Sequence, residues 1–158
     1  MDKSAGVTDN ALTFGDMLPD GGVLFGLDLG TKTIGVATCD AGWRFATAGK
    51  TINRSKFTKD AAILRGLIAE RGGAGIVIGL PRNMDGSEGP RAQASRAYAR
   101  NLAEMLGLPI LMWDERWSTS SAEADLIGQK MSRAKRATRI DSHAAAVILQ
   151  GALDTLTR

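Results

Sequence analysis

Apolar and small or polar residues alternate near the start of the chain, with the period of two that is typical of β-strands. Every second residue of Val23–Leu29 is apolar, and after a short turn at 30–33 the alternation resumes over Ile34–Thr38. Two alternating runs joined by so short a connection predict an antiparallel hairpin. We therefore expect the sheet of this protein to begin with these two neighbouring strands.

Downstream of the hairpin, apolar runs of strand length alternate with amphipathic stretches of helix length. The expected elements, in order, are a strand over 43–53, a helix over 57–71, a strand over 76–80, a helix over 90–106, a strand over 109–113, a short helix over 120–127, a basic irregular segment over 129–139 and a final helix from about Ile140. This order predicts an α/β fold. Its mixed five-stranded sheet combines an antiparallel three-strand meander with two parallel strands and is flanked by helices.

The first 22 residues are polar and rich in glycine, with no sustained apolar period. We therefore predict a flexible N-terminal extension over 1–22 and a single domain over 23–158. No apolar run approaches the ~20 residues that span a bilayer, and no basic stretch followed by an apolar one suggests a secretory signal. We expect no membrane association and a cytoplasmic location.

The chain contains one cysteine, Cys39, and one histidine, His143. These counts exclude an internal disulfide framework, a zinc site built from cysteines and a metal site with several histidines. Any metal ion that the chain itself holds must therefore have oxygen ligands, which suits Mg²⁺ or Mn²⁺.

Three carboxylates are the candidates for chemistry. Asp28 lies inside an apolar strand, where a charge is costly unless it is paired or bound to a metal ion. Glu115 follows the strand 109–113, and Asp141 opens the final helix, where it also fits a simple capping role. Asp114 is an alternative to Glu115, and of the two we prefer Glu115. In the expected sheet, these side chains converge at the carboxyl ends of the strands.

Converging carboxylates repel one another. Two unit charges ~4 Å apart at an effective dielectric constant of 20 cost on the order of 4 kcal/mol. Such a cluster persists when a divalent cation occupies it or when one member is protonated. The first alternative predicts a two-metal phosphodiester site, in which the ions activate water and stabilise the leaving oxygen.

Four ordered motifs make a family resemblance specific. They are Gly26-Leu27-Asp28-Leu29-Gly30-Thr31-Lys32-Thr33-Ile34-Gly35-Val36-Ala37; Gly79-Leu80-Pro81 with Asp85-Gly86-Ser87; Asp114-Glu115-Arg116 with Ser118-Thr119; and Ile140-Asp141-Ser142 with Ala144-Ala145 and Ile148-Leu149-Gln150. Over roughly residues 23–156 the chain closely resembles the bacterial YqgF family, also called RuvX-like. Members of that family are described as Holliday junction resolvases and as pre-16S rRNA nucleases.

The resemblance implies a ribonuclease H-like fold and a nuclease that depends on Mg²⁺ or Mn²⁺, with two ions. By motif, it assigns the catalytic, metal-binding carboxylates to Asp28, Glu115 and Asp141. It also implies a cytoplasmic protein that trims the 5′ end of precursor 16S rRNA, with resolution of branched DNA as the alternative.

A phosphodiester substrate needs cations around it, and the sequence pI of 9.3 is compatible with a nucleic-acid partner. The segment 129–139 is basic without any acid and leads directly into Asp141. Arg91 is a weaker candidate at the same rim. The residues that we predict to bind nucleic acid are Lys32, Arg82, Arg116, Arg133, Lys135, Arg136 and Arg139.

Two rival classes remain at this point. An actin-like ATPase uses a similar Asp-x-Gly hairpin, but it normally needs two such domains, and the chain has room for one. A non-catalytic nucleic-acid-binding protein linked to transcription is the other rival, although a pure binder gains nothing from acids beside phosphates. The oligomeric state stays open, because a junction resolvase is expected to be a homodimer whereas an RNA-trimming enzyme can act as a monomer.

Overall fold

The computed structural model describes residues 6–19, 22–117 and 133–157, and of residues 117 and 133–141 it describes the backbone alone. Within this part, six strands form one mixed sheet in the order β1-β6-β5-β2-β3-β4. The strands are β1 (Gly6–Thr8), β2 (Val23–Leu29), β3 (Thr33–Cys39), β4 (Ala46–Asn53), β5 (Gly73–Leu80) and β6 (Pro109–Asp114). The predicted α/β architecture is confirmed, with six strands in place of five.

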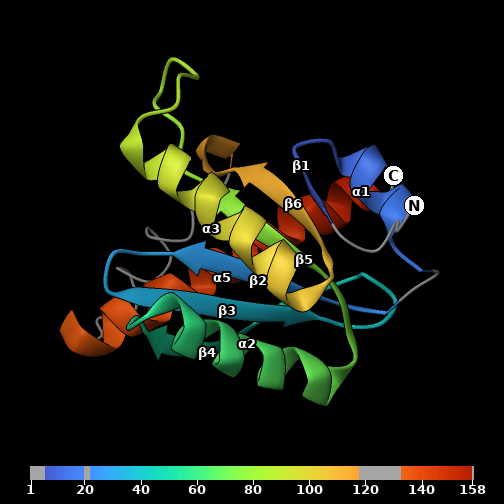
Figure 1. The fold of residues 1–158 in the computed structure, drawn as a ribbon, viewed down its shortest axis with the longest axis horizontal. Coiled ribbons are helices and arrows are strands. Elements are labelled where there is room, and N and C mark those ends of the chain that lie inside the picture. Colours follow the sequence, from blue (N-terminus) through green and yellow to red (C-terminus); the bar gives the residue numbers. More distant parts are fainter. Residues whose placement is uncertain (1–5, 20–21, 118–132, 158) are drawn as a thin grey trace.

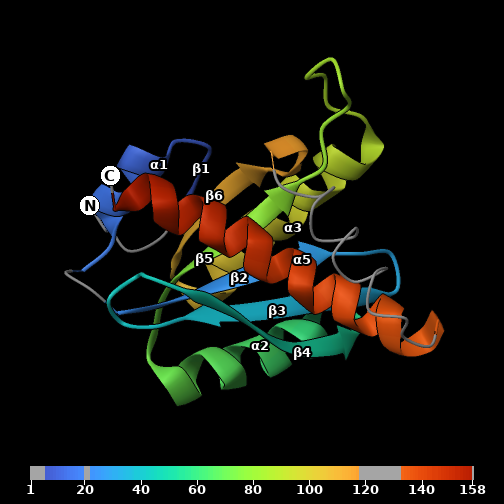
Figure 2. The same ribbon diagram turned by 180° about the vertical axis from the view of Figure 1, so that it is seen from behind.

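Helices cover both faces of the sheet (Figures 1 and 2). They are α1 (Ala11–Met17), α2 (Phe57–Arg71), α3 (Pro90–Leu106) and α5 (Arg133–Leu156), with one turn of 3₁₀ helix, η1 (Glu115–Trp117). The views show α2 and α3 on one face and α5 across the other. Among the described helices, none combines the length and the apolar character that a bilayer span requires.

The pairing of the strands follows the sequence pattern. β2 and β3 form the predicted antiparallel hairpin, and β4 continues the meander beside β3. On the other side of β2, the strands β5 and β6 run parallel to it. The third strand begins at Ala46 rather than at Trp43, because Trp43 has a left-handed backbone with φ 59° and cannot continue an extended strand.

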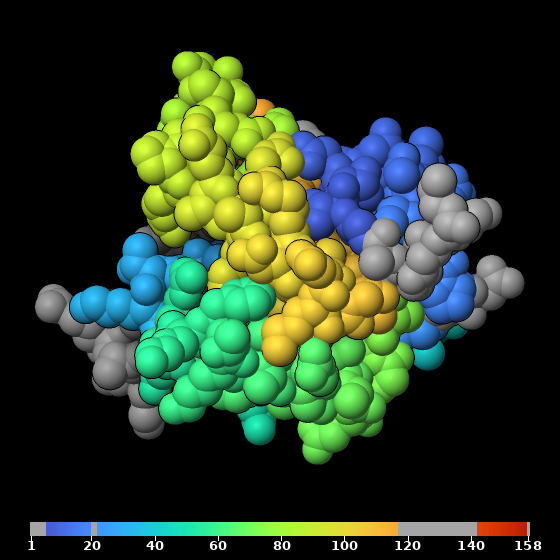
Figure 3. All heavy atoms as spheres, in the orientation of Figure 1, coloured from blue at the N-terminus to red at the C-terminus, as the bar shows by residue number. Residues whose placement is uncertain are grey.

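The N-terminal segment differs from the expectation. Residues 6–17 are not a flexible extension: β1 pairs in parallel with β6, and Phe14 of α1 is fully buried. Asp9, between these elements, accepts hydrogen bonds of 2.8 and 2.6 Å from the Arg96 guanidinium of α3. In the space-filling view, the N-terminal residues lie against α3 as part of one surface (Figure 3). Elements of three and seven residues are too short to leave a readable apolar period.

The last helix also begins earlier than expected. The basic stretch predicted to be irregular is helical from Arg133, so that prediction is wrong for 133–139. These residues are mostly alanine, arginine and lysine, which are strong helix formers, and the stretch has no glycine or proline. The predicted short helix over 120–127 lies outside the described residues.

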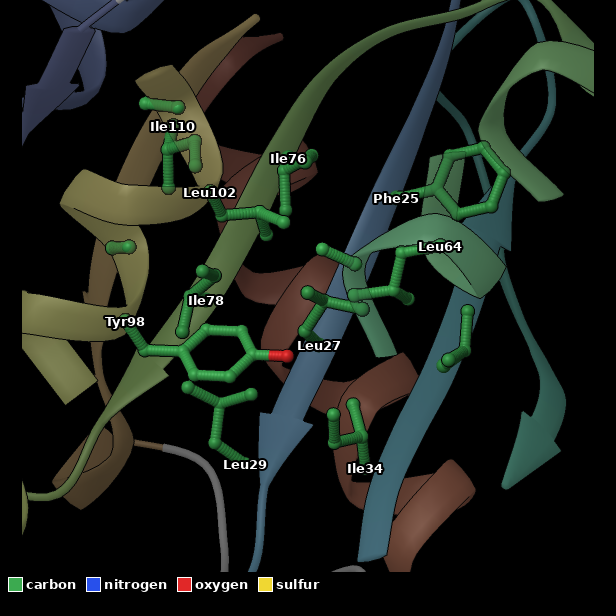
Figure 4. Packing of buried hydrophobic residues seen from close by; sticks show 14 of the residues in the cluster. Phe25, Leu27, Leu29, Ile34, Leu64, Ile76, Ile78, Tyr98, Leu102 and Ile110 are labelled. Carbon is green, nitrogen blue, oxygen red and sulfur yellow. The ribbon is translucent and has the colours of Figure 1, made fainter. Parts of the chain in front are cut away.

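The sheet separates two apolar clusters. On one face, alternate β2 residues such as Leu27 and Leu29 pack with side chains of α2 and α3 (Figure 4). On the other face, α5 lies very close to β2, because a Cβ added at Gly26 would be 2.8 Å from both the Ala145 carbonyl oxygen and the Leu149 Cβ. The absence of a side chain at residue 26 therefore fixes where α5 crosses the sheet.

Candidate functional site

The candidate site lies at the carboxyl ends of the parallel strands. Asp28 is the penultimate residue of β2, and Glu115 directly follows β6. Leu27 and Leu29 point into the cluster under α2 and α3, so the alternation of a strand directs Asp28 to the opposite face, which α5 covers. Both carboxylates are half-buried.

A glycine allows the two carboxylates to meet across an intervening strand. β5 lies between β2 and β6, and Gly79 is its penultimate residue. A Cβ added at Gly79 would be 2.8 Å from the Glu115 Cγ and 2.6 Å from the Ile148 Cδ1 of α5. The Glu115 side chain therefore lies over the bare backbone of β5 and reaches the Asp28 side chain, with which it shares a hydrogen bond.

This contact has an electrostatic consequence. Burial, and next the negative charge of Asp28, raise the pKa of the Glu115 carboxyl to about 7, whereas the Arg91 guanidinium acts in the opposite direction. A hydrogen bond between two carboxyl groups needs a proton on one of them. Without that proton, the pair needs a cation.

The donor set of this pair fits a divalent cation. Its carboxylate oxygens are the ligands that Mg²⁺ and Mn²⁺ prefer. Within the described side chains, Asp28 and Glu115 have no third aspartate, glutamate, histidine or cysteine beside them in a metal-binding group. The two residues are thus what this part of the chain offers to an ion.

Asp141, the third predicted carboxylate, is in the first half of α5, and its side chain lies outside the described part. Its backbone position is informative. It precedes Ala145 by about one helical turn, and the Ala145 carbonyl lies against Gly26 of β2. Residue 141 therefore belongs to the stretch of α5 that approaches β2.

Asp114 and Glu115, the two alternatives that the sequence left open, have different side-chain partners. The Asp114 carboxylate accepts hydrogen bonds of 3.0 and 2.6 Å from the Nε and Nη2 atoms of Arg116. The hydrogen bonds from Arg116 hold the pKa of Asp114 below its usual range. Glu115 is thus the residue that reaches Asp28, and Asp114 is neutralised by arginine.

Two of the predicted nucleic-acid-binding cations have internal partners. Arg116 forms an ion pair with Asp114 and donates to the Met84 carbonyl at 3.2 Å. Arg82 lies 3.2 Å from Asp9, 3.4 Å from Glu88 and 3.6 Å from Asp114. The positive charges of these two arginines are therefore largely balanced by carboxylates of the protein itself.

The other predicted cations fall into two groups. Lys32 is exposed in the turn between β2 and β3. The remaining four lie on the first two turns of α5, and their side chains are outside the described part: Arg133, Lys135, Arg136 and Arg139. All five stay predictions as nucleic-acid contacts.

Sequence reasoning overlooked the role of Gly79. The available signal was a single glycine in the otherwise apolar run 76–80, because an isolated strand glycine often marks a close approach of another group. It also overlooked Arg54, in the link between β4 and α2, whose Nη1 donates a hydrogen bond of 2.6 Å to the Gly30 carbonyl in the turn after β2.

Comparisons with known proteins find relatives in sequence and in fold. A family model described as "RuvX: Holliday junction resolvase" matches residues 22–155. A Novosphingobium aromaticivorans protein described as "Putative pre-16S rRNA nuclease" is 67% identical over 150 residues, which is 95% of this chain and 96% of the relative. A Bradyrhizobium protein with the same description is 62% identical over 139 residues, covering 88% of this chain and 86% of the relative.

Among solved structures, Thermus thermophilus RuvC in complex with a Holliday junction substrate superposes with a TM-score of 0.55 and 14% identity, over 85% of this chain and 95% of RuvC. A second T. thermophilus RuvC structure gives a TM-score of 0.54 with 13% identity, over 85% of this chain and 96% of that one. At such low identity the likeness is one of fold. It confirms the ribonuclease H-like fold that the sequence resemblance implied.

Proposed function

This chain belongs to the RuvX family, and on that premise we propose that it is a divalent-metal-dependent nuclease that processes the 5′ end of precursor 16S rRNA in the cytoplasm. The observation that carries the proposal is the contact between the Asp28 and Glu115 carboxyl groups across Gly79. Two carboxyl groups brought together at half-buried positions cost free energy, and a role in holding a cation accounts for that cost.

In this proposal, Asp28 and Glu115 hold Mg²⁺ or Mn²⁺, and Asp141 is the third ligand. Bound divalent ions supply Lewis-acid chemistry, which activates water and stabilises the leaving oxygen of a phosphodiester. The chain itself positions the two carboxylates: Asp28 is on a strand with neighbours on both sides, and Glu115 lies over Gly79 of β5, where Ile148 of α5 also packs. Ligands held in this way lose little conformational freedom when substrate arrives.

The relatives support RNA as the substrate. The two described above are more than 60% identical to this chain, and both carry the description "Putative pre-16S rRNA nuclease". The description of the family model favours a second candidate, the resolution of Holliday junctions in DNA. The two candidates differ in symmetry, because a resolvase that makes paired cuts requires a homodimer whereas RNA trimming does not.

A side-by-side cleavage assay tests the proposal. The purified protein is incubated with a labelled 5′ fragment of precursor 16S rRNA or with a synthetic four-way DNA junction, in Mn²⁺, in Mg²⁺ or in excess chelator. We expect cleavage of the RNA, no cleavage of the junction and no reaction in chelator. Paired symmetric cuts in the junction would instead assign the protein to recombination, and cleavage of neither substrate would favour a non-catalytic nucleic-acid-binding role.

A further inference from the structure

The arginines near the site divide into two groups by their partners. Arg82, Arg96 and Arg116 are all in ion pairs with aspartate or glutamate. Arg54 and Arg91 are exposed, and among the described residues neither has a carboxylate within ion-pair distance. Within the described part of the chain, no ion pair therefore neutralises the charge of either arginine.

Arg54 is fixed beside the end of β2. Its backbone amide donates to the Lys32 carbonyl at 2.8 Å, and its Nη1 donates to the Gly30 carbonyl at 2.6 Å. Gly30 follows Asp28 by two residues, which is about 7 Å along an extended chain. The Arg54 guanidinium is thus hydrogen-bonded to the turn that follows Asp28 in the chain.

The plane of the Arg54 guanidinium is also held. Its Cζ lies 5.3 Å from the centroid of the Tyr98 ring, and that ring packs edge-to-face on Phe57 with centroids 5.1 Å apart. One of the five N–H donors of Arg54 goes to Gly30, which leaves donors for a ligand. A cationic side chain that is already ordered loses less conformational entropy when it binds an anion.

Arg91 approaches the same place from α3. Together with Arg54 it lines a cavity of about 120 Å³. The other lining residues come from the end of β2, the turn after it and one face of α3: Leu29, Gly30, Thr31, Ala94, Ser95 and Tyr98. Leu29, which lines this cavity, directly follows Asp28 at the end of β2, so the cavity and the carboxylate pair lie at the same end of that strand.

We propose that Arg54 and Arg91 form a binding site for a backbone phosphate of the nucleic-acid strand, next to the carboxylate pair. The inference rests on the proposed function, because it requires a nucleic-acid substrate. The site binds a phosphate adjacent to the one that is cleaved, and so sets the position of the strand relative to Asp28 and Glu115. RNA and DNA backbones share this chemistry.

The test measures binding without catalysis. Fluorescence anisotropy gives the affinity for labelled single-stranded RNA, and for single-stranded DNA of the same sequence, in excess chelator and over a range of salt concentrations. The variants are Arg91→Ala and the Arg54→Ala, Arg91→Ala double variant. Arg100→Ala is the matched control, because Arg100 is also an exposed arginine of α3 but does not line the cavity.

For the double variant, we expect the slope of log affinity against log salt to become shallower by about 0.7, the value for one single-strand phosphate contact. We expect affinity at low salt to fall by at least about tenfold, which corresponds to the loss of a charge-assisted hydrogen bond. The effects should be equal for RNA and DNA, and Arg100→Ala should bind as wild type.

An unchanged slope in a folded double variant overturns the phosphate site, as does a loss confined to RNA, which would point to contacts with the 2′-hydroxyl. If circular dichroism shows that the double variant is unfolded, Arg91→Ala alone decides, by the same slope. The proposed function fails separately, if wild type binds both strands and the variants lose affinity but no substrate is cleaved in Mn²⁺.

Discussion

Replacing Asp28 with asparagine is expected to reduce cleavage of the precursor rRNA fragment by at least about a thousandfold, because the change removes a ligand of the ions on which the reaction depends. Asparagine keeps the size of the side chain and one oxygen, but it does not carry the charge that attracts a divalent cation. The measurement is the initial rate of cleavage in saturating Mn²⁺.

The same variant should fold at least as well as wild type. Asp28 and Glu115 are two carboxyl groups in contact, so removing one charge relieves repulsion instead of breaking a favourable ion pair. In chelator, the midpoint of thermal unfolding is expected to be unchanged or raised. Asp16→Asn, at an exposed position of α1, is the matched control and should leave both cleavage and stability unchanged. Wild-type cleavage by Asp28→Asn would remove Asp28 from the catalytic site.

Replacing Gly79 with alanine is expected to reduce cleavage by at least about a hundredfold, although residue 79 carries no chemical group. The added Cβ would lie 2.8 Å from the Glu115 Cγ and 2.6 Å from the Ile148 Cδ1, closer than real Cβ contacts. Glu115 must then turn away from Asp28 or α5 must shift. Displacing a reacting group by about 1 Å costs on the order of a hundredfold in rate. Overpacking should also lower the free energy of unfolding by about 1–3 kcal/mol.

Gly66→Ala is the control for this experiment. An added Cβ at Gly66, in α2, meets no atom within 4 Å. Because alanine is the better helix former, this variant should be more stable by about 0.5–1 kcal/mol and should cleave normally. The measurements are initial cleavage rates and urea unfolding in chelator. A Gly79→Ala variant with full activity would contradict the geometry in which Glu115 reaches Asp28 across β5.

The sequence was informative where a period or an unusual residue marked a structural role. The alternation over Val23–Leu29 predicted β2 and its partner, and an aspartate in that apolar strand pointed to the site. Glu115 was preferred to Asp114, but the sequence had no means to decide between adjacent carboxylates. The face of the sheet on which each lies depends on where β6 ends, and the Asp114–Arg116 ion pair becomes visible only in the structure.

Tertiary contacts explain what the sequence could not predict. The pairing of β1 with β6 joins residues about a hundred positions apart, and the polar character of the N-terminal segment concealed it. Arg82 and Arg116 are predicted to bind nucleic acid because the sequence does not reveal their partners. Asp9 is 73 residues from Arg82 along the chain, and Asp114, the partner of Arg116, ends strand β6. Arg54 is near the site only because the turn after β2 binds it.

The central claim is that Asp28 and Glu115 together hold a divalent cation. The most direct test is calorimetric titration of Mn²⁺ into metal-free wild type, Asp28→Asn, Glu115→Gln and the double variant. We predict that wild type binds Mn²⁺ and that each single variant binds at least about tenfold more weakly, since even outer partners of metal ligands cost that much. The double variant should lose less than the sum of the two single losses, because the residues share one ion. Equal affinity of wild type and both single variants for Mn²⁺ would contradict the account.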